Sequence, residues 1–79
     1  MTALNIVDTK TMIAILNRLG FKFIRQRGSH AYYAHPDGRS TVIPKHQGED
    51  LGRGLIRQIL RDIDISVEEY ERLRRKSRK

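Results

Sequence analysis

The residues with the most evident chemical potential in this sequence are consecutive: Arg25-Gln26-Arg27-Gly28-Ser29-His30. Arginine presents a planar set of donors that stays charged at any physiological pH and suits a phosphodiester. Histidine is the side chain whose ordinary pKa lies near neutrality, so it can exchange a proton there. A basic strand end, a turn glycine and an exposed histidine would explain the same residues without chemistry. These six residues alone therefore do not establish phosphate chemistry, and other parts of the chain are needed to support it.

On RNA, His30 could take the proton from a 2′-hydroxyl or deliver one to the leaving 5′-oxygen. Arg25, Arg27 or Lys45 could offset the charge that builds on the phosphate. Ser29 has no evident acid partner to activate it, so a hydrogen bond to phosphate or a role in the turn is the better interpretation. The pattern predicts an acid/base histidine among phosphate ligands.

Two further histidines carry weaker signals. His35 precedes a proline at a strand end, where a structural or merely exposed role is expected. His46 lies in a polar loop that could bring it near His30 as a second acid/base or a substrate ligand, and a loop-anchoring role explains it equally well. The three histidines are separated by five and then eleven residues, which matches no familiar zinc pattern, and the chain has no cysteine. We therefore expect neither a metal nor another cofactor.

The elements that must hold these side chains follow from periodicity and turn residues. Apolar residues at helical spacing predict two helices, the first capped by Asp8 or Thr9, and Ser66 with Glu69 has the capping-box spacing for a short third helix from residue 67. The expected helices are at about 9–19 and 53–63, and the expected strands at 21–27, 30–35 and 39–43. This order of elements, in which three tightly connected strands lie between two helices, indicates an α+β fold in two layers. The fold has a three-stranded antiparallel sheet with both helices on one face.

Alternation along the second strand puts His30 and Tyr32 on one face and Ala31 and Tyr33 on the other. Because each face has a tyrosine, periodicity does not decide which face is buried. Either tyrosine could stack on a base, although tyrosines in a small sheet more often belong to the core and its rim.

The formal net charge of +7 is unevenly distributed over the 79 residues. Residues 72–79 contain six basic side chains and no acid, which leaves ten basic and nine acidic residues, a net charge of +1, in residues 1–71. We expect a single domain over 1–71 and a mobile basic tail over 72–79 that adds salt-sensitive affinity for a polyanion.

A chain this short favours chemistry on an open face. The absence of cysteine, of a signal sequence and of a long apolar run favours a cytoplasmic protein without a membrane segment.

Taken together, four motifs resemble those of the HicA toxin family. They occur in the same order and at the same spacing as in that family, over about residues 9–70. They are Leu19-Gly20-Phe21, Arg25-Gln26-Arg27-Gly28-Ser29-His30, Ile43-Pro44-Lys45-His46 and Leu55-Ile56-Arg57-Gln58-Ile59-Leu60. The resemblance implies a double-stranded-RNA-binding-domain-like α-β-β-β-α fold and an mRNA-cleaving toxin neutralised by a HicB-type antitoxin. It maps the family's catalytic histidine onto His30 and the glycine of its Gly-Ser-His motif onto Gly28. Arg53 departs from the proline common there, and the tail lies outside the pattern.

The sequence therefore predicts a metal-independent endoribonuclease that cleaves mRNA with His30 as its acid/base. The expected substrate ligands are Arg25, Arg27, Gly28, Ser29, Lys45 and His46. The alternative is a non-catalytic double-stranded-RNA-binding module of the same fold, because duplex shape is read through phosphates and 2′-hydroxyls without a histidine. A DNA-binding regulator is disfavoured because no helix-turn-helix is evident. The antitoxin is expected to cover the His30 face with an acidic patch.

Overall fold

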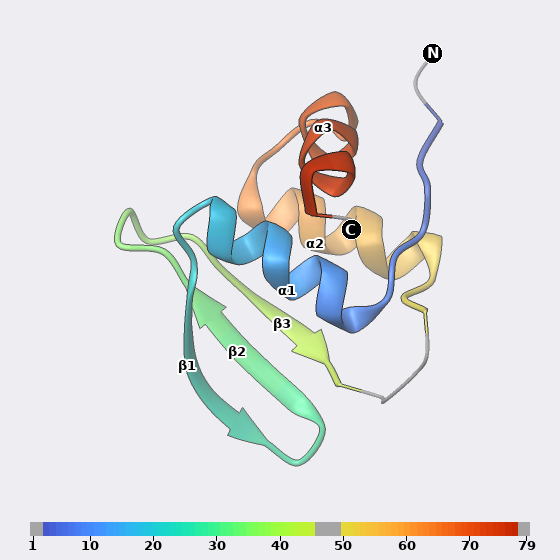
Figure 1. The fold of residues 1–79 in the computed structure, drawn as a ribbon. Coiled ribbons are helices and arrows are strands. Elements are labelled where there is room, and N and C mark those ends of the chain that lie inside the picture. The colour runs from blue at the N-terminus through green and yellow to red at the C-terminus, as the bar shows by residue number, and fades with distance from the viewer. Residues whose placement is uncertain (1–2, 46–49, 78–79) are drawn as a thin grey trace.

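The computed structural model describes residues 3–45 and 50–77. Its elements are α1 (Thr9–Arg18), β1 (Lys22–Arg27), β2 (His30–Ala34), β3 (Ser40–Pro44), α2 (Arg53–Ile63) and α3 (Val67–Ser77). The strands form one antiparallel sheet in the order β1-β2-β3, and the helices lie on one side of it (Figure 1). The predicted α+β fold, with both predicted helices on one sheet face, is confirmed.

The start of α1 is fixed by two neighbouring side chains with different partners. The Asp8 carboxylate accepts a hydrogen bond from the Thr11 backbone N–H at 2.9 Å and so caps the helix. The Thr9 hydroxyl instead donates to the Pro44 carbonyl oxygen at 3.2 Å. The N-terminus of α1 is therefore tied to the end of β3.

The passage from α1 to β1 depends on a glycine. Gly20 has φ +96°, in the left-handed region, and a Cβ there would lie 3.1 Å from the His35 ring. That ring packs edge-on against Phe21, with centroids 5.1 Å apart, and its Nδ1 accepts the Asp37 backbone N–H. His35 therefore has a structural role, which is one of the two roles, structural or merely exposed, that its position before a proline predicts.

The core lies between the sheet and the helices and consists of the apolar side chains that follow the helical periodicity. Its fully buried aliphatic members include Met12, Ile15 and Leu16 of α1, Ile56, Ile59 and Ile63 of α2, and Ile43 of β3. Burying each such side chain contributes about 1.5–3 kcal/mol before the cost in conformational entropy. Among the described residues, no helix combines the length and apolarity that crossing a bilayer requires.

Residues 72–77, expected to lie in a mobile tail, instead continue α3. Ser66 caps this helix, since its hydroxyl oxygen accepts the Glu69 backbone N–H at 3.1 Å, as the spacing predicts. Tyr70 is fully buried and Leu73 nearly so, in a helix that packs against α1. Because Leu73 follows Tyr70 by three residues, the two give an otherwise charged helix one apolar side.

A buried polar cluster joins α3 to the segment before α1. The Glu71 side chain is 4% exposed and accepts hydrogen bonds from the Asn5 backbone N–H, the Asn5 side-chain amide and the Arg74 guanidinium. Burial raises the pKa of the Glu71 carboxyl, but these hydrogen bonds outweigh it and hold that pKa below its ordinary value. The Tyr70 hydroxyl donates to the Asn5 carbonyl oxygen. Burial raises the pKa of Tyr70 to about 12. The cluster therefore fixes α3 to the N-terminal segment.

Candidate active site

The sheet face that points away from the helices is not covered by any described helix or strand, and it carries His30 (Figure 1). On β2, Ala31 and Tyr33 are 0% and 5% exposed and point into the core, whereas His30 is exposed and Tyr32 is half-buried. Side chains alternate between faces, so His30 and Tyr32 share the uncovered side. The position of the helix layer therefore shows which face of β2 is buried. The sequence left this question open because each face of the strand has a tyrosine. We refer to the uncovered side of the sheet as the open face.

An irregularity in β1 gathers basic side chains on this face. Lys22 lies opposite Ala34 and Arg27 lies opposite His30, but the register shifts between Phe23 and Arg25 because Ile24 is an extra residue. Strict alternation would put Lys22 and Arg25 on opposite faces. The bulge brings Lys22 onto the same face as Arg25 and Arg27, because cross-strand partners share a face.

Arg25 is held over the open face by an aromatic ring. It lies opposite Tyr32 on β2, and its guanidinium carbon is 4.8 Å from the centre of the Tyr32 ring. Such a cation–π contact is worth about 0.5–1 kcal/mol at an exposed site, and it leaves the N–H donors free to bind phosphate. Tyr33 is buried in the core and so cannot stack on a base.

The connection between β1 and β2 is a two-residue turn formed by Gly28 and Ser29. Gly28 has φ +58° and Ser29 does not have positive φ, which is the pattern of a type II′ turn. The Gln26 side-chain amide donates to the Gly28 carbonyl oxygen at 2.9 Å. The Lys45 backbone N–H donates to the Ser29 carbonyl oxygen at 2.6 Å. The second bond places Lys45 beside the turn that leads into His30.

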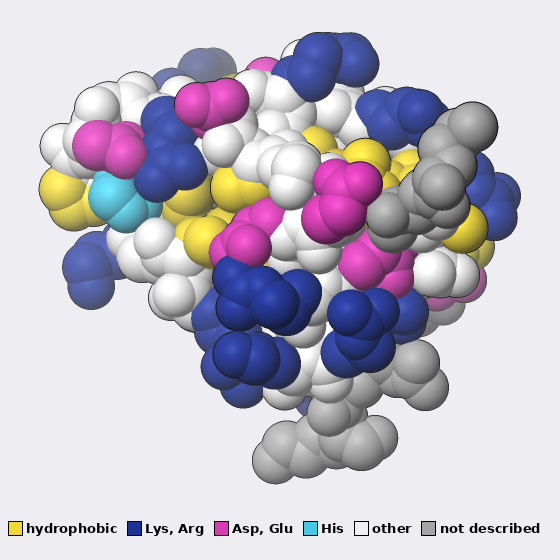
Figure 2. Space-filling model, turned by 90° about the horizontal axis from the view of Figure 1, so that it is seen from above, with side chains coloured by type: hydrophobic (Ala, Val, Ile, Leu, Met, Phe, Trp, Pro, Cys, Tyr) yellow, Lys and Arg dark blue, Asp and Glu magenta, His cyan; other side chains and the backbone are white. Residues whose placement is uncertain are grey.

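The open face is basic and has no acidic counterpart on the sheet. Lys22, Arg25 and Arg27 are exposed there, Lys45 is exposed beside the turn, and none of the three strands contains Asp or Glu. On the helix side, by contrast, acidic side chains lie among the basic ones (Figure 2). A surface of one charge sign attracts an anion such as a phosphodiester.

Within the described part of the chain, the imidazole of His30 has no hydrogen-bond partner. Its nitrogens are therefore available to a substrate that lies on the open face. His46, predicted as a second acid/base or a substrate ligand, lies outside the described residues. Among residues 3–45 and 50–77, no three side chains of His, Cys, Asp or Glu lie close enough together to hold a metal ion.

Comparison with known families gives a match to the one described as "HicA toxin of bacterial toxin-antitoxin", over residues 9–65. This chain belongs to the HicA toxin family. The match begins at the first residue of α1 and ends between α2 and α3, so it includes the whole open face. No match is found among curated proteins. As a HicA family member, the chain is a toxin of a toxin-antitoxin system.

The structure brings together five of the predicted site residues of this HicA toxin: Arg25, Arg27, Gly28, Ser29 and Lys45 all lie on or beside the open face with His30. Sequence reasoning missed Lys22, because strict alternation along β1 places it on the other side. A signal was present. Phe23 and Ile24 are two adjacent apolar residues where alternation expects one, which is typical of a bulge.

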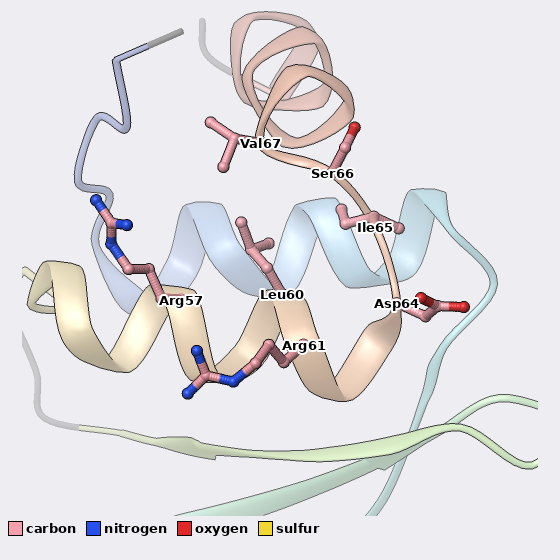
Figure 3. A pocket seen from close by; sticks show the side chains of 7 residues that line it. All are labelled: Arg57, Leu60, Arg61, Asp64, Ile65, Ser66 and Val67. Carbon is pink, nitrogen blue, oxygen red and sulfur yellow. The ribbon is translucent and has the colours of Figure 1, made fainter. Parts of the chain in front are cut away.

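A hollow on the helix side of this HicA toxin is separate from the open face. Side chains of α2, of the α2–α3 connection and of the start of α3 line it (Figure 3). They are Arg57, Leu60, Arg61, Asp64, Ile65, Ser66 and Val67. None of the predicted substrate ligands belongs to this set, so this hollow is not part of the candidate site.

Proposed function

We propose that this HicA toxin is an endoribonuclease that cleaves mRNA with His30 as its acid/base. The observation that carries the proposal is the open face, where an exposed histidine lies among basic side chains and none of the three strands contains an acidic residue. A phosphodiester gains negative charge as its phosphorus is attacked, so fixed cations beside it stabilise the transition state more than the ground state. An exposed imidazole next to Arg27 is suited to the proton transfer that this attack requires.

RNA supplies its own nucleophile, the 2′-hydroxyl. In its neutral form, the His30 imidazole accepts the 2′-hydroxyl proton while the 2′-oxygen bonds to phosphorus and the bond from phosphorus to the 5′-oxygen breaks. The leaving 5′-oxygen takes a proton from the imidazolium or from water. The products are a 2′,3′-cyclic phosphate and a 5′-hydroxyl, so the substrate must be RNA rather than DNA.

The remaining predicted ligands are proposed to bind the phosphates at and beside the bond that is cleaved. Arg25 and Arg27 offer planar donors to phosphate oxygens from β1. Gly28 has no side chain to obstruct the backbone at the turn, so a phosphate can approach closely. Ser29 and Lys45 are proposed to contact the same or a neighbouring phosphate. His46 is proposed as a further substrate ligand or a second acid/base.

We expect cleavage to continue at an unchanged rate in excess EDTA, because arginine and lysine side chains supply the positive charge that a metal would otherwise supply. The measurement is the fragmentation of a short, unstructured, end-labelled RNA with and without the chelator. A metal-dependent nuclease in the same buffer is the positive control for chelation. Loss of cleavage that a divalent ion restores would contradict the metal-free mechanism.

We further propose that the antitoxin of this system is of the HicB type and covers the open face with an acidic patch. Opposite charge speeds the encounter, and both ligands then compete for one surface. The purified complex should not cleave RNA, and its melting temperature should exceed that of the free toxin, because the antitoxin binds only the folded form. The test is to co-express the adjacent reading frame and measure both quantities. A stable complex that cleaves RNA as fast as the free toxin would show that His30 is not occluded.

A further inference from the structure

β1 differs from the other strands in that none of its six residues is buried. β2 and β3 each have two buried residues, which face the helices. Among residues 3–45 and 50–77, β1 pairs only with β2, and it forms the outer margin of the sheet away from α2 (Figure 1). Its free edge therefore presents backbone N–H and C=O groups without a strand partner, which is a template for adding another strand.

Two consecutive residues of this strand are apolar and exposed. Phe23 is 52% exposed and Ile24 is 59% exposed, and Ile6 is the other large hydrophobic residue that is exposed among those described. The Phe23 ring packs edge-on against Tyr33, with centroids 5.8 Å apart, so its position is fixed. Covering both side chains would remove apolar surface from water, which favours a protein partner on this edge.

The charge of β1 selects among possible partners. Lys22, Arg25 and Arg27 are three cations in six residues. Pairing β1 antiparallel with β1 of a second copy would bring these like charges opposite one another, which is destabilising, whereas opposite charges across a pair are favourable. The charge therefore disfavours a second copy and fits an extended segment that is acidic and carries apolar residues.

We propose that the antitoxin binds by adding an extended acidic segment as a fourth strand to the free edge of β1. The inference rests on the assignment of the chain as a toxin with a protein antitoxin. Apolar side chains of the added segment cover Phe23 and Ile24, and its carboxylates face the β1 cations. Neighbouring strands lie about 4.8 Å apart, so the segment lies about 10 Å from β2. From there the rest of the antitoxin extends over His30, which explains how the exposed imidazole is blocked.

The direct test is hydrogen–deuterium exchange of the His30→Ala toxin, free and in complex with the product of the adjacent reading frame. Strand addition gives the outward amides of residues 22–27 hydrogen-bond partners, so their exchange should slow at least about tenfold in the complex. Unchanged exchange in this segment would overturn the proposal. Slow exchange that appears in the free toxin as its concentration rises would also overturn it, because the edge would then bind a second copy.

A matched pair of substitutions tests the apolar contact. Ile24→Ser should weaken antitoxin binding about tenfold, as for loss of a buried apolar interface contact. Ile6→Ser is the matched control, because it removes the same type of side chain from the N-terminal segment, where Ile6 is 40% exposed. The Kd of this variant for the antitoxin should stay within about twofold of the wild-type value. Equal effects of the two substitutions would refute the docking site. Because binding and exchange are measured without RNA, absence of ribonuclease activity in the wild-type toxin would reject the proposed activity and leave this test intact.

Discussion

Replacing His30 with alanine should lower the rate of RNA cleavage by about 10²–10⁴-fold, the usual value of a positioned acid/base. The substitution should leave the fold intact, because the side chain is exposed and has no hydrogen-bond partner among the described residues. Binding of RNA should change little, since the cations of the open face remain. The measurement combines single-turnover cleavage, circular dichroism and binding of an RNA with 2′-deoxy sugars, which cannot be cleaved by this route.

A matched histidine substitution separates chemistry from structure. His35 packs against Phe21 at the other end of β2, so His35→Ala should lower stability and leave cleavage within a few fold at a temperature where the variant is folded. Wild-type rates in folded His30→Ala would remove His30 from the mechanism. Tight binding by the wild-type toxin without any cleavage, even on long incubation, would instead favour the non-catalytic RNA-binding module.

Ending the chain after Glu71 should destabilise the domain by about 3–5 kcal/mol, a large part of the 5–15 kcal/mol typical of a native domain. The charge distribution alone predicts that this truncation keeps the fold, but α3 changes the expectation. The truncation removes Leu73 from the core and removes Arg74, which leaves the buried Glu71 carboxylate with Asn5 as its only partner among the retained described residues. Urea unfolding monitored by circular dichroism measures the loss.

A second variant separates the charge of this segment from its packing. Arg75→Gln with Lys76→Gln keeps Leu73 and Arg74, and both substituted side chains are exposed. It should unfold at nearly the wild-type urea concentration, and the dependence of RNA binding on salt should become shallower by about one to two units of log–log slope. A truncated chain as stable as the full one would show that the segment after Glu71 contributes nothing to the stability of the fold. An unchanged salt slope would show that these charges do not contact RNA.

The sequence by itself determined the local elements and the identity of the candidate catalytic group. Met12, Leu16, Ile56 and Ile59 follow helical spacing so clearly that both core helices lie within a residue of their predicted bounds. These features depend on residues close together in the chain, where periodicity, caps and turn residues carry the information. The same is true of Gly28, whose positive φ closes the turn that presents His30.

The tertiary structure alone decided which residues surround His30. The helix layer buries Ala31 and Tyr33, and this burial exposes the opposite face of β2. The bulge at Ile24 brings Lys22 onto that face, because pairing with β2 rather than strict alternation sets the register.

The tertiary structure also decided that most of the basic C-terminal segment is part of a packed helix rather than a tail. Residues 72–77 are charged enough to predict a tail, yet Leu73 is buried and Glu71 is bonded to Asn5, 66 residues earlier in the chain. Contacts between residues so far apart leave no periodic trace in the sequence. They depend on how the sheet and the helices place the two ends of the chain, which is why local patterns could not predict them.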